Sequence, residues 1–98
     1  MPRLINHDPN ARLDYCWDWG QPDWAGRSWL GPDEIVAAEI LVNPPWSVVV
    51  EAPIIEEAKV TAFVASGMIG ATVGITCRIT TASGRIDDRT LWLKIRER

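Results

Sequence analysis

Alternating apolar and polar residues dominate the last third of the chain. Between positions 72 and 80, four apolar residues occupy every second position, and Leu91, Leu93 and Ile95 repeat the pattern further on. This period of two is typical of a half-buried β-strand. Residues 81–84, Thr-Ala-Ser-Gly, form a turn signal between the two runs, with glycine placed for a positive φ. We therefore predict a C-terminal β-hairpin, and the rest of the chain has to cover its apolar face.

Shorter segments upstream have the same character. Strand patterns occupy residues 12–19, 34–42, 46–50 and 59–65. Residues 20–33 contain three glycines and two prolines and predict a long loop, and residues 52–57 predict a connection. The spacing indicates an all-β fold, an immunoglobulin-like antiparallel β-sandwich of six to seven strands with a C-terminal β-hairpin.

The domain organisation is simple. Residues 1–11 are polar, and Pro2 and Pro9 exclude a helix, so we expect an N-terminal arm that is either disordered or ordered by a partner. Residues 12–98 form a single β-sandwich domain of a size that buries one core. We find no apolar run that predicts a membrane span or a secretory signal.

The two cysteines lie on different strand faces. Cys77 is in phase with the apolar residues of its strand, and Cys16 with the polar residues. We expect two free thiols in a reducing cytosol, with a disulfide between them as the alternative.

Charge is distributed unevenly. The net charge is −3, yet residues 1–57 hold ten acidic and three basic residues, whereas residues 78–98 hold six basic and three acidic ones. An acidic domain whose cations alternate along a hairpin does not favour nucleic-acid binding. The asymmetry allows head-to-tail contacts between copies, and a solvated mixed surface explains it equally well.

The sequence contains few features that indicate catalysis. The single histidine, His7, lies in the arm, and no nucleophile, phosphate-binding or dinucleotide motif is present. Asp87 and Asp88 could hold a hard cation, but bonds to nearby arginines or backbone amides explain them better. We expect no catalytic residue, no metal and no cofactor. The residues around the hairpin turn are assigned a structural role: Gly84, Arg85, Asp87, Asp88 and Arg89.

The chain is rich in tryptophan, with six in 98 residues, and their positions help to distinguish core from interface. Trp17 and Trp19 are in phase with an apolar face and predict core positions, and Trp46 is expected to pack under a loop. Trp92 stands on the polar side of its strand, so it either contacts a partner or packs beneath the arm or the long loop. The candidate protein interface comprises Arg3, Leu4, Ile5, Trp24, Trp29, Trp92, Lys94, Arg96 and Arg98. Trp29 could instead cap one end of the sandwich.

Several segments together resemble a known family. They are Asp8-Pro9-Asn10-Ala11, Leu13-Asp14-Tyr15, Asp18-Trp19, Trp29-Leu30, Asp33-Glu34-Ile35, residues 79–85, Asp87-Asp88-Arg89-Thr90-Leu91 and residues 95–98. In these the chain is similar to short tail-associated proteins of tailed bacteriophages and prophages, described as fibre–tail adaptors.

The resemblance implies a non-enzymatic virion structural protein with an immunoglobulin-like fold. Such a protein is assembled in the cytoplasm of the host bacterium and present in several copies at the tail, the neck or the head–tail connector. Its expected partners are other tail proteins and other copies of itself, with no nucleic acid and no membrane. The alternative is a carbohydrate-binding β-sandwich module that recognises a host-surface glycan through Trp24, Trp29 or Trp92.

Overall fold

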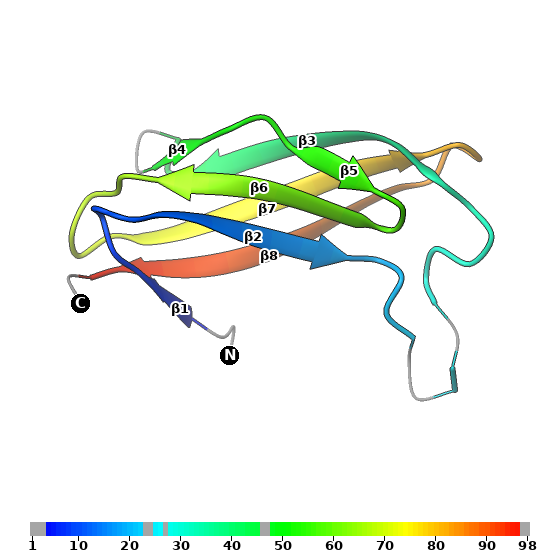
Figure 1. The fold of residues 1–98 in the computed structure, drawn as a ribbon, viewed down its shortest axis with the longest axis horizontal. Coiled ribbons are helices and arrows are strands. Elements are labelled where there is room, and N and C mark those ends of the chain that lie inside the picture. Colours follow the sequence, from blue (N-terminus) through cyan, green and yellow to red (C-terminus); the bar gives the residue numbers. More distant parts are fainter. Residues whose placement is uncertain (1–3, 23–24, 27, 46–47, 97–98) are drawn as a thin grey trace.

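The computed structural model describes residues 4–22, 25–26, 28–45 and 48–96, and within them every regular element is a strand (Figure 1). The strands are β1 (Leu4–His7), β2 (Arg12–Asp18), β3 (Ile35–Asn43), β4 (Val49–Val50), β5 (Ile54–Glu56), β6 (Lys59–Ala65), β7 (Thr72–Thr81) and β8 (Ile86–Ile95).

Two sheets face each other and form a sandwich. The first sheet has the order β1-β8-β7-β3, and the second has the order β2-β6-β4, with β5 also paired to β6. The predicted all-β sandwich and its C-terminal hairpin, β7–β8, are confirmed. The described residues form eight strands, because β1 and β5 occur in segments for which we predicted an arm and a connection. The immunoglobulin-like character of the sandwich stays a prediction.

The core lies between the central strands. Inward-facing side chains of β6 and β7, among them Val60, Val64, Val73 and Ile79, are completely buried. Alternation on these strands places every second residue in the core, as the period of two requires. The predicted core position of Trp19 is correct, because its side chain is completely buried.

β1 connects the two sheets. It runs parallel to β8, with Leu4 beside Trp92 and His7 beside Ile95. The side chain of His7 is completely buried, and its Nδ1 lies 2.8 Å from the hydroxyl oxygen of Tyr15 on β2. Residues 4–7 of the predicted arm are therefore part of the folded sandwich.

The sandwich is elongated, with extents of 41 × 27 × 18 Å. At one end, which we call the clamp end, the β2–β3 loop meets the β7–β8 turn (Figure 1). At the other, the tip end, the β6–β7 turn lies beside the last residue of β8, where the Gly70 amide donates to the Ile95 carbonyl at 2.9 Å. β8 joins the two ends.

Candidate functional site

The β7–β8 turn is built to hold Arg85 in a fixed direction. Gly84 has a φ of 93°, which glycine adopts without a steric penalty. The amide of Thr81 donates to the Arg85 carbonyl at 2.9 Å, and the Arg85 amide donates to the buried Thr81 hydroxyl at 3.0 Å. With its backbone fixed in this way, Arg85 extends its side chain toward the β2–β3 loop.

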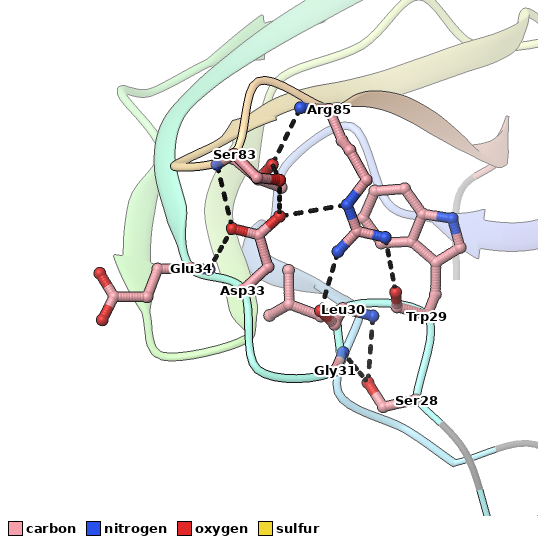
Figure 2. A network of polar contacts seen from close by, with 9 residues as sticks. Ser28, Trp29, Leu30, Gly31, Asp33, Glu34, Ser83 and Arg85 are labelled. Carbon is pink, nitrogen blue, oxygen red and sulfur yellow. Dashed lines mark hydrogen bonds and ion pairs between the residues drawn. The ribbon is translucent and has the colours of Figure 1, made fainter.

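The Arg85 guanidinium anchors that loop through three contacts (Figure 2). It donates to the carbonyls of Trp29 and Leu30 at 3.0 and 2.8 Å, and to the Asp33 carboxylate at 3.1 Å. Its carbon also lies 4.2 Å from the centre of the Trp29 ring. The planar guanidinium suits this task because its donors form a rigid fork and its face stacks on an aromatic ring.

Asp33, in the β2–β3 loop, in turn binds the β7–β8 turn (Figure 2). Its carboxylate accepts a hydrogen bond from the Ser83 hydroxyl and a second from the Ser83 amide at 3.2 Å. The hydrogen bond from Ser83 is the largest of several that hold the pKa of Asp33 well below its usual range, since each stabilises the charged form. The loop and the turn therefore behave as one unit, which we call the Arg85 clamp.

The Arg85 clamp presents Trp29 to the solvent. The Trp29 side chain is 37% exposed although one of its faces is covered by Arg85. An open pocket beside it is lined by Trp29, Leu30, Gly31, Pro32, Asp33, Ser83 and Arg85. A fixed, half-exposed tryptophan next to a shallow pocket is suited to contact with another protein.

Asp87 and Arg89 face inward, unlike Asp88. The Trp19 indole donates to the Asp87 carboxylate at 2.8 Å, and Arg89 lies over the Trp19 ring and donates to the Asp18 carbonyl at 2.8 Å. Asp88 faces outward and forms a bidentate pair with Arg78, at 2.9 and 3.0 Å. In the structure all three residues make contacts within the fold.

Three predicted interface residues of the first sheet, Leu4, Trp92 and Lys94, lie together on its outer face. Leu4 is 50% exposed beside the half-buried Trp92, and Lys94 donates to the Gly70 carbonyl at 2.9 Å. Ile5 instead faces the core, and Arg96 is exposed just after β8. Trp29 lies apart from them at the clamp end. Arg3, Trp24, Arg98 and Trp46 lie outside the described residues.

Most basic side chains in the described part of the chain are engaged within the fold. Arg78 pairs with Asp88, Arg85 with Asp33, and Arg89 with Asp87 at 3.5 Å. Arg12 pairs with Glu51, and its second nitrogen donates at 2.8 Å. Of these four pairs only Arg85–Asp33 joins the acidic and the basic part of the sequence, because each of the others lies within one part.

Sequence reasoning missed the role of Asp33 and the His7–Tyr15 contact. Asp33 is 50 and 52 positions away from its partners Ser83 and Arg85, and no local pattern links them. For Asp87 and Arg89 a signal exists, because they continue the inward phase of Leu91 and Leu93.

Acidic clusters and thiols are the remaining chemical groups to consider among the described residues. They contain no group of three or more His, Cys, Asp or Glu side chains placed to hold a metal ion. Both cysteines are free, with Cys16 exposed and Cys77 buried, as the phase of each strand predicted. Among the described segments there is no helix with the length and apolarity needed to cross a membrane.

Comparison with known proteins identifies the family. The search of curated proteins found no match. A family model described as "Podophage GP4 fiber-tail adaptor protein gp77" matches residues 7–94, which include the Arg85 clamp and all strands from β2 to β7. This match covers nearly the whole chain, and the protein belongs to the podophage fibre–tail adaptor family.

Proposed function

We propose that this protein is a non-enzymatic virion structural protein that joins a fibre to the tail by contacting a different tail protein with each end. An adaptor needs two separate contact surfaces. The observation that carries the proposal is the presence of exposed apolar side chains at both ends of an elongated sandwich: Trp29 and Ile86 at the clamp end, and Met68 and Ile69 at the tip end.

The two surfaces are far enough apart to serve two partners. Ile86 begins β8 and is 64% exposed, and Ile69, 62% exposed, lies in the turn beside the end of this strand. A ten-residue strand spans about 30 Å. Large apolar side chains exposed in this way are favourable anchors for protein contacts.

Both ends have defined backbones. The Arg85 clamp fixes the first, and at the second the Ala71 amide donates to the Met68 carbonyl at 3.0 Å. Contact residues on a fixed backbone lose less conformational entropy on binding. This supports docking between preformed surfaces.

Several copies per virion, assembled in the host cytoplasm, form part of the proposal. Self-association would follow the symmetry that most protein assemblies adopt. Charge alone gives little support to head-to-tail contacts, because Arg78, Arg85 and Arg89 are engaged within the fold. The molecular mass measured by light scattering across a range of concentrations decides between a discrete oligomer and a monomer.

No observation on the described residues favours the carbohydrate-binding alternative. Arg85 covers one face of Trp29, and Trp92 packs over Gly74. A shift of tryptophan fluorescence on adding host-surface glycans would support the alternative over the adaptor.

The adaptor function is tested with two matched variants, Ile86→Asp and Ile69→Asp. The two isoleucines are similarly exposed and lie at opposite ends, so neither substitution should disturb the core. In phage particles that lack the wild-type protein, we expect each variant to fail at a different contact. One should stay bound to the tail without fibres, and the other should bind fibres but stay off the tail, as seen by electron microscopy and pull-down. Fibres attached normally in particles without any copy of the protein would refute the proposal.

A further inference from the structure

One side of the sandwich is left open. It is formed by β3 at the edge of the first sheet and by β4 and β5 at the edge of the second, and we call it the β3 side. Four large apolar side chains are exposed along it: Val36 (56%), Val49 (58%), Ile54 (49%) and Ile55 (37%). Of these, Ile55 faces the space between the sheets, opposite the buried Val60, whereas Val49 and Ile54 lie on the outer face of the second sheet.

In the described part of the chain, the outer backbone groups of β3 are not paired with another strand. Within the described residues this nine-residue strand pairs only with β7, so alternate peptide groups of β3 point away from the sheet. Glu39 is its only charged residue, and the strand contains neither lysine nor proline. The one irregularity, a bulge between Ile35 and Ala37, lies at the clamp end. From Ala38 to Asn43 the edge is a regular template for another strand.

The opposite side of the sandwich is closed by contrast. There, His7 contacts Tyr15, and Arg89 donates to the Asp18 carbonyl, so polar contacts join the two sheets. The edge strand β2 also directs Arg12, Asp14 and Asp18 outward, which protects it from unwanted pairing.

On the β3 side, no hydrogen bond or ion pair in the described part of the chain joins the side chains of β3 to those of β4 or β5. Because they lie on edge strands, the inward-facing residues Ile40, Val42 and Val50 are only partly buried. An added strand would find apolar side chains to cover as well as backbone groups to pair with.

Charge indicates what kind of strand fits. Glu34, Glu39, Glu56 and Glu57 are exposed in or next to β3 and β5. The strand pairing places two cations against them, Lys59 opposite Glu56 and Arg78 opposite Glu39, and Arg78 already forms a bidentate pair with Asp88. A second copy docked by two-fold symmetry would bring the same acidic residues together, which is unfavourable. A basic partner is complementary.

We propose that an extended segment of another virion protein, with apolar residues alternating with lysine or arginine, adds to β3 as an outer strand. Its backbone continues the first sheet beyond β3. One face of the segment covers Val42 and Ile55, and the basic residues on its other face approach Glu39. This inference rests on the proposed function in one respect, because it takes the partner from the same virion.

Hydrogen exchange provides the direct test. The tail and fibre proteins of the phage that encodes this chain are purified singly and mixed with it, and amide exchange is followed by mass spectrometry. In the complex with one of them, we expect peptides covering residues 36–43 to exchange at least about tenfold more slowly than in the free protein. Peptides covering residues 12–18 of β2 serve as the internal reference and should not change.

Two charge-reversal variants form a matched pair. Glu39→Lys and Asp14→Lys each reverse one exposed acidic residue in the middle of an edge strand. We expect Glu39→Lys to weaken binding of the same protein about tenfold, while Asp14→Lys binds like wild type. Thermal unfolding confirms that both are folded, a necessary control because the lysine introduced by Glu39→Lys would face Arg78 across the sheet.

Each outcome decides a separate question. Protection of residues 36–43 together with a selective effect of Glu39→Lys supports the inference. Binding with unchanged exchange in β3, or protection of β3 by a second copy of this chain, overturns the inference and leaves the adaptor function standing. If none of the tail or fibre proteins binds, both the adaptor function and the inference fail.

Discussion

The ring of Trp92 lies directly over Gly74 of the neighbouring strand, so that a Cβ atom at position 74 would be 3.0 Å from the nearest ring carbon. The contact places the ring on the outer face of the first sheet, beside Leu4. It explains how a tryptophan on the polar face of a strand becomes half-buried without a partner. Contact of Trp92 with another virion protein stays a prediction.

Replacing Gly74 with alanine should displace this ring. We expect Gly74→Ala to lower the free energy of unfolding by about 1 kcal/mol, because the added methyl group crowds the indole. In a Trp92→Ala background the same change should be neutral or stabilising, since alanine suits a strand better than glycine. Chemical denaturation of the four proteins gives the coupling energy. Equal effects of Gly74→Ala in both backgrounds would show that the two residues do not interact.

Arg85 should be hard to replace, even by lysine. Arg85→Lys keeps the charge but cannot reach the Asp33 carboxylate and the Trp29 and Leu30 carbonyls together. We expect a loss of about 1–2 kcal/mol in unfolding free energy and faster hydrogen exchange in residues 28–34. The control is Arg78→Lys, which alters an exposed pair with Asp88 and should lower the unfolding free energy less than Arg85→Lys does. Equal losses for the two variants would contradict the anchoring role of Arg85.

Asp33 should make the protein sensitive to acid. Its pKa is lowered in the folded state, chiefly by Ser83, so its contribution is present above the unfolded-state pKa and is lost as the pH falls through the folded value. Stability should therefore decline as the pH drops below about 4. Asp33→Asn should be less stable at neutral pH and show a flatter decline. Arg78 also lowers the pKa of Asp88, so Asp88→Asn serves as a comparison that should flatten the decline less than Asp33→Asn. An unchanged acid profile for Asp33→Asn would argue against the role of this carboxylate.

Strand periodicity was the part of the fold that sequence predicted well. β6 spans the expected residues 59–65, and the β7–β8 hairpin lies where the alternation and the turn signal placed it. β1 and β5 were missed because they are four and three residues long, too short to show a period. β1 also depends on parallel pairing with β8, more than 80 positions away.

The candidate site was less predictable for a related reason. Sequence marked Trp29 as a loop anchor and Arg85 as part of a turn, but nothing local indicates that one covers the other. The contact depends on how the β2–β3 loop returns across the end of the sandwich. Such long-range geometry follows from packing of the whole chain and not from the pattern of any one segment.

The two thiols should differ sharply in reactivity. Burial, with a smaller contribution from the Asp88 charge, raises the pKa of Cys77 to about 12, whereas Cys16 is exposed on β2. Because the thiolate is the reactive form, a thiol reagent at pH 8 should modify one cysteine quickly in the native protein and the second only after unfolding. Cys16→Ser should remove the fast phase. Rapid native labelling of Cys77 would show that the core opens more readily than the structure indicates.

His7 should make the stability of the fold depend on pH in the mildly acidic range. Burial of the ring lowers its pKa below the ordinary value of 6.5, although the Ser66 backbone and Asp8 act in the opposite direction. The unfolded chain then binds a proton that the folded chain resists, so stability should fall as the pH drops below about 6.5 and level off below the folded pKa. This pH window lies above that of Asp33.

Two variants test the role of His7. His7→Leu should abolish the decline in stability between pH 7 and pH 5. Tyr15→Phe removes the hydroxyl bonded to Nδ1 and should retain a histidine-dependent decline from a lower starting stability. Thermal unfolding at a series of pH values measures both, and a wild-type profile that is flat across this range would show that His7 stays equally protonated in the folded and unfolded chains.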